Sequence, residues 1–442
     1  MCDVEKMFHR FHVKEVDRDF LWFLWWEGGN TDSEPKEYRM KVHLFGAASS
    51  PGCANYGMKY LATQNEKEFP LAADFIKKNF YVDDGITSIK SVDTAIKLVE
   101  EAQAVCAKGQ LRLHKFISNE RMVLESICES ERAKEVRDVD LSHDDLPVQT
   151  VLAVRWNVER DVFSFKVSLD EKPMTRRGIL STVASVYDPL GFLAPFLLTG
   201  KQVLQEICQK GVGWDELLPD ELKPRWESWV SDLKNLEKIQ IPRCYSPANF
   251  GKILRTELHH FSDASSQGYG QCTYIRFVSE NKVHCTLVMG KARVAPTKVV
   301  TIPRLELTAA VISAAVSSML KEELELKVDK EYFWTDSQVV LGYVSNEARR
   351  FHIFVANRVQ RIRETTNPQQ WHYVDTNENP ADYASRGLNV SELINSSWFQ
   401  GPKFLWEREL DIKQGTSELL VGDPEIKSGD PLRLPLLPPA CS

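Results

Sequence analysis

The stretch Tyr81-Val82-Asp83-Asp84 follows an apolar segment that ends at Phe80 and precedes a turn-forming glycine. Two adjacent carboxylates at the junction of two strands repel each other, because like charges at this separation disfavour joint ionisation. A bound divalent cation relieves that repulsion, and Mg²⁺ prefers hard oxygen ligands of this kind. The stretch therefore predicts a metal site on a strand–turn–strand unit, with an ordinary surface turn as the alternative.

Length and composition indicate a globular protein of several domains. The chain has 442 residues, 43% of them hydrophobic and 26% charged, which predicts two or three domains. A formal net charge of −7 excludes a protein that coats nucleic acid by bulk charge, so a nucleic-acid surface must be a local basic patch. The nine cysteines form no C-x-x-C pair, which argues against zinc knuckles and a disulfide framework.

We therefore expect an intracellular protein, because reducing compartments suit free cysteines. No signal peptide opens the sequence, and no apolar run is long enough to span a bilayer, so no membrane partner is expected. The apolar run Phe20–Trp26 is too short to span and predicts a buried strand.

Periodicity divides the chain into four segments. Residues 1–166 alternate strand-like and helix-like stretches, with an amphipathic helix over 91–107. Residues 167–252 are predicted to be mostly helical. Residues 253–390 read as three strands, a long helix, a strand, a helix and a final strand, which is typical of a mixed α/β domain. Residues 391–442 are predicted to be a linker and a partly disordered tail with a Leu/Pro-rich end.

A third carboxylate is expected beside the Asp83-Asp84 pair. Metal-dependent nucleotidyl transfer uses two metal ions about 3.5–4 Å apart, which two carboxylates alone do not hold. Asp3, in the stretch Asp3–Phe8 (DVEKMF), supplies the third acid. The alternative is a polar residue at a frayed terminus.

Here the chain resembles the reverse transcriptase of BEL/Pao-type retrotransposons. YVDD is the signature of the reverse transcriptase palm, and DVEKMF followed by DRDFLWFLWW resembles the first palm motif. HLFGAASSP (residues 43–51) and LHKFISN (residues 113–119) resemble two further motifs. The resemblance implies that Asp3, Asp83 and Asp84 are catalytic metal ligands. It implies nucleotide contacts at four residues: Phe8, Phe45, Gly46 and Lys115. The alternatives are core packing for the phenylalanine at position 8 and a solvated side chain for the lysine.

The polymerase half departs from the family in two ways. A predicted hairpin of residues 150–156 and 162–167 contains LAVRWN at the primer-grip position, with Ala153 where the family usually has glycine. The sequence also begins at the first palm motif, so the fingers have no counterpart. Positioning supplies much of a catalytic acceleration, so the polymerase site is expected to be incomplete.

A second set of four acids lies in the mixed α/β segment. Asp263 ends an apolar strand in HFSDAS, and Asp336 follows another strand in FWTDSQ. Glu306 is predicted in the first turn of a helix that Pro303 starts, and Asp382 opens a helix in NPADYASR. Each acid has apolar neighbours, which predicts half-buried carboxylates that need a partner or a metal. Taken singly, each has a helix-cap alternative.

The four acids together resemble the Asp-Glu-Asp-Asp site of ribonuclease H, and all four stretches resemble the BEL/Pao family. The resemblance implies cleavage of RNA in RNA–DNA hybrids by two Mg²⁺ ions, with Mn²⁺ as an alternative. Asp263 would be shared by both metals, with Glu306 and Asp336 on one and Asp382 on the other. His372, in the preceding strand, is expected to be structural.

A basic stretch follows the third acid. Residues 348–363 carry five arginines and no acid, and interleaved apolar residues predict a helix with one face in the core. We expect Arg349, Arg350 and Arg358 to contact phosphates of the nucleic acid, which positions a duplex without reading its sequence. An ordinary solvated helix face is the alternative.

The sequence thus predicts an α/β (α+β) protein with a partial polymerase palm, a helical thumb or connection segment and a ribonuclease H-like domain. The expected protein is a retrotransposon pol polyprotein fragment that acts on RNA–DNA hybrid and template–primer, in the cytoplasm within a retrotransposon particle or in the nucleus. No D-[ST]-G loop is present, which excludes an aspartic peptidase. The alternative function is a catalytically inactive, domesticated fragment that binds nucleic acid or protein.

Overall fold

The computed structural model describes residues 1–137, 139–141, 143–151, 154–167, 172–412, 419 and 422–427. The chain forms two compact units. Unit 1 comprises Met1–Gln149 with Asn157–Asp161, and unit 2 comprises Thr150–Trp156 with Val162–Ser442. The predictions about position 153 and about the Leu/Pro-rich end lie outside the described residues.

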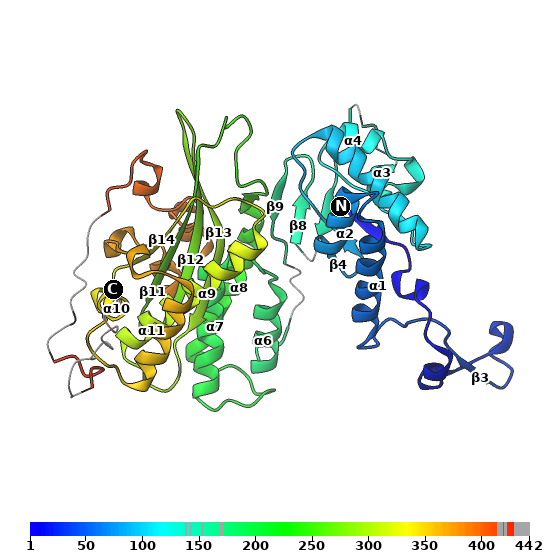
Figure 1. The fold of residues 1–442 in the computed structure, drawn as a ribbon. Coiled ribbons are helices and arrows are strands. Elements are labelled where there is room, and N and C mark those ends of the chain that lie inside the picture. Colours follow the sequence, from blue (N-terminus) through cyan, green and yellow to red (C-terminus); the bar gives the residue numbers. More distant parts are fainter. Residues whose placement is uncertain are drawn as a thin grey trace, which may run out of the picture. The chain divides into compact units, whose positions relative to one another are not determined.

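Unit 1 contains a four-stranded sheet with the order β4-β5-β1-β6. Its strands are β1 (Cys2–Val4), β4 (Phe80–Tyr81), β5 (Asp84–Gly85) and β6 (Leu113–His114). Three helices bury their apolar faces in the same core as the sheet (Figure 1): α1 (Ser50–Asn65), α2 (Pro70–Lys78) and α3 (Val92–Lys108). Two short helices follow, α4 (Arg121–Glu125) and α5 (Lys134–Arg137).

Helix α3 confirms the amphipathic helix predicted over residues 91–107. Ser91 is its N-cap, and its side chain accepts a hydrogen bond from the backbone N–H of Thr94 at 3.3 Å, which satisfies one of the free donors at a helix start. Leu98, Ala102 and Val105 are buried on one face of the helix. The 3.6-residue period of the sequence therefore predicts the buried face of α3, and it predicts the ends of the helix to within one residue.

The prediction of a buried strand over Phe20–Trp26 is wrong. Among the described residues, strand β2 (Trp22–Trp25) pairs with β3 (Lys36–Arg39) alone, and all four of its residues are exposed. Phe20 ends a 3₁₀ helix and is 85% exposed. The partner strand has the sequence KEYR and offers no apolar face, so this hairpin cannot bury its aromatic residues by itself.

A further sheet has the order β10-β9-β8-β7. Its strands are β7 (Val148–Val151), β8 (Val154–Asn157), β9 (Val162–Ser164) and β10 (Gln240–Pro242). Strands β8 and β9 correspond to the two arms of the predicted hairpin, and β10 pairs with β9 from more than 70 residues away. The sequence pattern does not predict that last pairing, because it is long-range.

Unit 2 is centred on a five-stranded mixed sheet with the order β13-β12-β11-β14-β15. The strands are β11 (Arg255–Ala264), β12 (Gly268–Val278), β13 (Val283–Val294), β14 (Lys330–Thr335) and β15 (Trp371–Tyr373). Strand β11 lies at the centre, antiparallel to β12 and parallel to β14. The predicted order of strands and of the long helix is confirmed, but two helices, α10 (Gln338–Ser345) and α11 (Ile353–Thr365), stand where one was predicted before the final strand.

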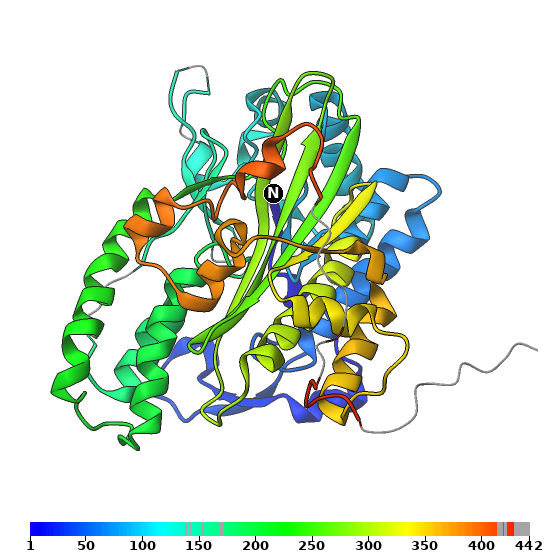
Figure 2. The ribbon, with the colours of Figure 1, turned by 90° about the vertical axis from the view of Figure 1, so that its left-hand side faces the viewer.

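Helices cover both faces of this sheet (Figures 1 and 2). One face carries α9 (Ile302–Glu323), α10 (Gln338–Ser345) and α11 (Ile353–Thr365), and the other carries α6 (Arg176–Ser185), α7 (Ala194–Gln209), α8 (Lys223–Asp232), α12 (Ala381–Arg386) and α13 (Val390–Asn395). Leu258 packs toward α9, whereas Phe261 packs toward the other face, as the period of two in a strand requires. In the described part of the chain, no helix is both long and apolar enough to cross a membrane.

Residues 391–412 belong to unit 2 and are not the predicted linker. Trp398 and Leu405 are fully buried. The indole N–H of Trp398 donates to the carbonyl of Phe192 at 2.8 Å, and the Tyr274 hydroxyl donates to the Trp398 carbonyl at 2.7 Å. Arg276 Nε donates a hydrogen bond to the Leu405 carbonyl at 2.7 Å. These contacts fix the segment against the sheet.

Candidate active site

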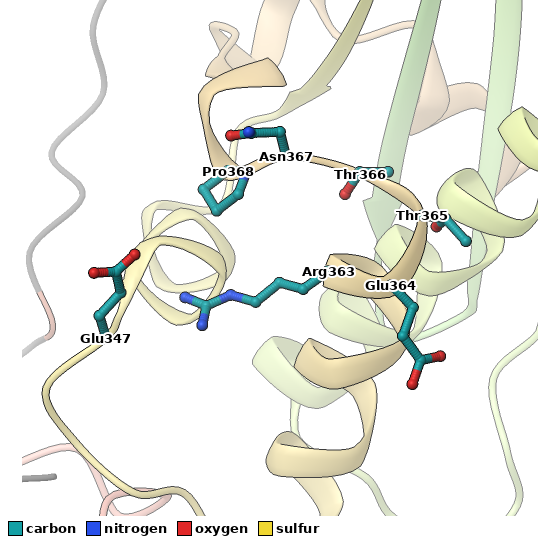
Figure 3. Close-up of a pocket in the computed structure, with 7 residues that line it drawn as sticks. All are labelled: Glu347, Arg363, Glu364, Thr365, Thr366, Asn367 and Pro368. Carbon is teal, nitrogen blue, oxygen red and sulfur yellow. The ribbon is translucent and has the colours of Figure 1, made fainter. Parts of the chain in front are cut away.

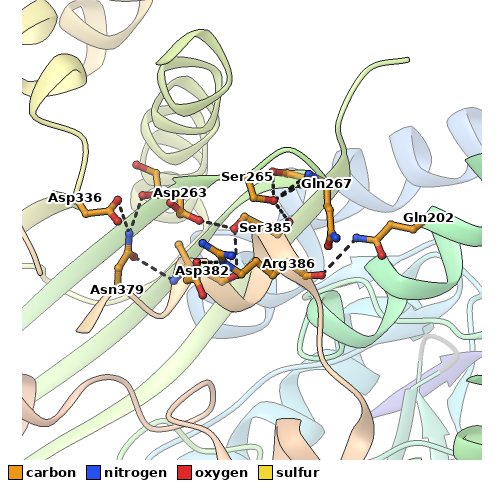
Figure 4. A network of polar contacts seen from close by, with 12 residues as sticks. Gln202, Asp263, Ser265, Gln267, Asp336, Asn379, Asp382, Ser385 and Arg386 are labelled. Atoms are coloured by element: carbon orange, nitrogen blue, oxygen red, sulfur yellow. Dashed lines mark hydrogen bonds and ion pairs between the residues drawn. The ribbon is translucent and has the colours of Figure 1, made fainter. Parts of the chain in front are cut away.

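Two of the four ribonuclease H-type acids lie at the carboxyl ends of parallel neighbouring strands. Asp263 is the penultimate residue of β11, and Asp336 directly follows β14. Ligands of α/β sheets bind at this edge, where loops and helix starts leave room. Helix α12 brings Asp382 to the same edge (Figure 4), and Glu306 reaches it from α9. Glu306 is the fifth residue of α9, slightly beyond the predicted first turn.

Each of the four carboxylates accepts a hydrogen bond from a protein donor. The four pairs, partly visible in Figure 4, are Ser385 Oγ to Asp263, Ser337 Oγ to Glu306, Asn379 Nδ2 to Asp336, and Arg386 Nε to Asp382. As the side chains stand, no three His, Cys, Asp or Glu residues of the described ranges converge closely enough to hold a metal ion.

The cluster is short of positive charge. Burial raises the pKa of Asp263 to about 7, and repulsion by Asp336 and Asp382 adds to the shift. The pKa of Glu306 is raised by burial and by Asp336. The pKa of Arg386 is raised, chiefly by its hydrogen bond to Asp382. A group of buried and half-buried acids with too little cationic compensation favours either protonation or a bound cation.

Two residues that the sequence analysis did not single out hold the acids in place. Asn379 Nδ2 donates both to Asp336 and to the backbone carbonyl of Ser262 on β11, each at 3.2 Å. Ser385 donates to Asp263 from α12. Both belong to the stretch NPADYASRG, so the motif contained the signal, although no role was assigned to them.

Gly270 allows α12 to approach the sheet. It is the antiparallel partner of Asp263 on β12. A Cβ atom at this position would lie 2.8 Å from the Cβ of Ala384 and 2.5 Å from the carbonyl of Lys291. Only glycine avoids these contacts, so it sets the distance at which Ser385 meets Asp263.

The three acids of unit 1 are also brought together. Asp3 on β1 stands opposite Asp84 on β5 in the antiparallel register. Burial raises the pKa of Asp84, and the neighbouring Asp83 and Asp3 raise it further. Val82 adopts a left-handed backbone with φ of 57°, which is rare for a β-branched residue. Val82 and Asp83 thus form the turn between β4 and β5, and Asp84 is the first residue of β5.

Both carboxylate oxygens of Asp3 have cationic or imidazole partners. His114 Nε2 lies 2.9 Å from one oxygen, and Lys115 Nζ donates to the other at 2.9 Å. This hydrogen bond is the main cause of the raised pKa of Lys115. Lys115 is therefore not merely a solvated lysine. The contact of His114 with Asp3 was not predicted, although His114 lies in the LHKFISN stretch.

The predicted nucleotide contacts differ in exposure. Phe8 is only 6% exposed and belongs to the core of unit 1. Phe45 packs edge-on against it at 4.8 Å between ring centroids and is 61% exposed. Gly46 adopts φ of 83° with open space around it. Of the two rings, only that of Phe45 is broadly accessible to a ligand.

The predicted arginine helix begins later than expected. Helix α11 starts at Ile353, so Arg349 and Arg350 precede it and are exposed. The side chain of Asn346 accepts a hydrogen bond from the backbone N–H of Arg349 at 3.0 Å and stabilises a turn there. Arg358 lies on the helix, over the Phe354 ring at 3.4 Å.

Arg363 serves packing instead of phosphate contact. Its guanidinium donates to the carbonyls of Val344 and Asn346 at the end of α10, with a shortest distance of 2.6 Å. It points into a shallow cavity of about 370 Å³ (Figure 3) that none of the seven predicted acids lines. His372 stacks obliquely on Trp334 at 5.3 Å, which agrees with a structural role.

The fold is similar to that of the structure described as the foamy viral protease-reverse transcriptase dRH in complex with double-stranded DNA, with a TM-score of 0.51 and 13% identity. The similarity covers 85% of this chain, which spans 56% of that protein's length. At this identity the similarity concerns the fold, and the mixed α/β class is confirmed.

Residues 175–337 match the family described as the Pao retrotransposon-like RNaseH-like domain. The match includes Asp263, Glu306 and Asp336 and ends before Asp382. It also begins inside the predicted helical segment, in agreement with unit 2 as one compact body. A search of curated proteins found no match. The resemblance to Pao-type retrotransposon proteins is thereby confirmed over this stretch.

Proposed function

We propose that unit 2 is an RNA–DNA hybrid endonuclease whose site consists of Asp263, Glu306, Asp336 and Asp382. The observation that carries the proposal is the cluster itself: four acids at one sheet edge, with Asp263 held at a pKa of about 7 by burial and by two of the others. The donor set is all oxygen, which suits Mg²⁺ or Mn²⁺. Bound there, such ions would activate water and stabilise the leaving oxygen.

The surrounding residues would prepare the acids for this cation. Asn379 ties Asp336 to β11, which keeps the two strand-end acids in register. Ser385 and Arg386 hold Asp263 and Asp382 while no cation is bound. We infer that cation binding replaces these hydrogen bonds, because a carboxylate oxygen that binds a metal has less capacity left for a donor.

The test is cleavage of an RNA–DNA hybrid by the full chain. We expect cleavage of the RNA strand with Mg²⁺ or Mn²⁺ and none in chelator, and Glu322→Gln on the exposed end of α9 serves as an active control. Full-length RNA after long incubation with either metal would favour the alternative, an inactive binding fragment. The protein donors now paired with every acid are the observation that keeps this alternative open.

For unit 1 we infer template or primer binding with little synthesis. Asp3 would have to exchange His114 and Lys115 for metal ions, and the lysine is a competing cation. Primer extension on an RNA template is therefore expected to be weak or absent. Robust extension that Asp83→Asn abolishes would contradict this inference, because it would show a competent metal site.

A further inference from the structure

A short acidic segment near the C-terminus lies on the arginine-bearing side of unit 2. The segment is Gly422–Lys427 (GDPEIK). Asp423 accepts hydrogen bonds from the Tyr343 hydroxyl at 2.8 and 3.1 Å, one to each carboxylate oxygen. Glu425 accepts a hydrogen bond from Arg304 Nε, and it is 8% exposed. Both acids are therefore engaged by side chains of α9 and α10.

The backbone of the segment is docked in the manner of a strand. Ile426 forms an antiparallel bridge with Phe351. The N–H of His352 donates to the Glu425 carbonyl at 2.9 Å, and the N–H of Lys427 donates to the Arg350 carbonyl at 2.8 Å. The segment thus covers the chain immediately before α11, where the two exposed arginines lie.

The surface beneath the segment concentrates guanidinium groups. We define the arginine surface as Arg304, Arg349, Arg350, Arg358 and Arg361. Two of these guanidiniums lie over the same Phe354 ring, at 4.8 Å for Arg304 and 3.4 Å for Arg358. Burial lowers the pKa of Arg358, and repulsion by its arginine neighbours lowers it further. Such a cluster attracts an anion.

The arginine surface and the candidate active site both include residues of the first turns of α9. Arg304 precedes Glu306 by two residues, and Arg358 Nε donates to the Thr308 hydroxyl at 3.2 Å, two residues after it. Arg304 and Thr308 are four residues apart and share one face of α9, whereas Glu306 lies on another face of the helix. Phosphates contacted by arginine position a duplex without reading its sequence.

We propose that Glu425, with Asp423 beside it, occupies a phosphate-backbone site on the arginine surface, so that the C-terminal segment competes with the nucleic acid for it. The inference rests on the proposed function. The two carboxylates lie on one turn, in which the N–H of Glu425 donates to Asp423 Oδ1 at 2.8 Å and the N–H of Ile426 donates to the Asp423 carbonyl at 3.2 Å. The Arg304 side chain is 38% exposed, and a partly exposed ion pair is weak enough for a polyanion to displace.

The first experiment compares two double variants of the full chain in chelator. Asp423→Asn with Glu425→Gln removes two charges from the segment, and Glu322→Gln with Glu323→Gln removes two charges from the exposed far end of α9. We expect the segment variant to bind a labelled RNA–DNA hybrid several-fold more tightly than the control variant. The slope of its log binding constant against log salt concentration should steepen by about 1–2, because arginines freed from the segment can then contact phosphates. Adding Arg304→Ala should cancel this gain.

A second measurement follows the segment itself. In the parent protein, hybrid should increase hydrogen exchange at the amides of His352 and Lys427, whose acceptors lie across the bridge. Unchanged exchange on a saturated complex, or equal affinities of the two double variants, would overturn the inference. Inorganic tripolyphosphate separates the two proposals: if it binds the segment variant more tightly while hybrid binds neither variant, the anion site stands and the nuclease function fails.

Discussion

Asp263→Asn is expected to abolish hybrid cleavage and, in chelator, to raise the melting temperature above that of the parent at neutral pH. The carboxylate is buried, and its pKa in the folded protein is about 7 against an ordinary value of 3.8. Asparagine keeps the size of the side chain and its acceptor for Ser385, and it cannot ionise. The substitution thus removes a charge that only a cation would stabilise.

The pH dependence has a definite sign. Because the pKa of Asp263 is raised on folding, the unfolded chain loses this proton first as the pH rises. The parent should therefore lose stability between about pH 4 and pH 7 relative to the variant, and the loss should level off above pH 7. A pKa difference of about three units corresponds to a loss in the free energy of unfolding of roughly 4 kcal/mol at most.

Thermal melting of both proteins from pH 4.5 to 8 in chelator measures this difference. Saturating Mg²⁺ should reduce the difference in melting temperature at pH 8, because the cation should bind and stabilise the parent but not the variant. Glu322→Gln, on the exposed end of α9, controls for loss of one surface charge. Parallel curves for parent and variant would show that Asp263 ionises normally, and retained cleavage would show that it is not a metal ligand.

The sequence predicted those parts of the fold that local pattern and motif spacing determine. The strand, helix, strand and helix carrying Asp263, Glu306, Asp336 and Asp382 follow in the expected order, since each element has its own period and start signal. The pairing of Asp3 with Asp84 also followed from the motifs. In both cases most of the acids lie at or near the end of a strand or the start of a helix, a position that the local sequence pattern can identify.

Features that depend on distant partners could not be predicted. The run Phe20–Trp26 is apolar enough for a core, but burial depends on what packs against it, and β3 offers charged residues. Ser385, the partner of Asp263, lies 122 residues further along the chain. Segment 422–427 has no apolar period, and its position depends on contacts with distant residues, among them the bridge to Phe351 and the ion pair with Arg304.

Trp398→Ala should be the most destabilising single change in the C-terminal part of unit 2. The side chain is fully buried, and its indole N–H donates to Phe192, 206 residues earlier in the chain. A Cβ atom on Gly290 would lie 2.6 Å from the indole ring, which shows how closely the sheet packs against it. Truncation would leave a large cavity and an unpaired carbonyl, at a cost of about 3–5 kcal/mol.

For a unit of this size that cost corresponds to a fall in melting temperature of roughly 6–20 °C. Trp406→Ala is the matched control, because Trp406 lies in the same segment, is 39% exposed and makes one hydrogen bond, to the Gln400 carbonyl. Its loss should cost clearly less than the loss of Trp398, because part of its side chain is already exposed to solvent. If the two variants melted together, residues 391–412 would be a dispensable linker after all. A large difference would show that unit 2 needs this segment to close the face of the sheet opposite α9.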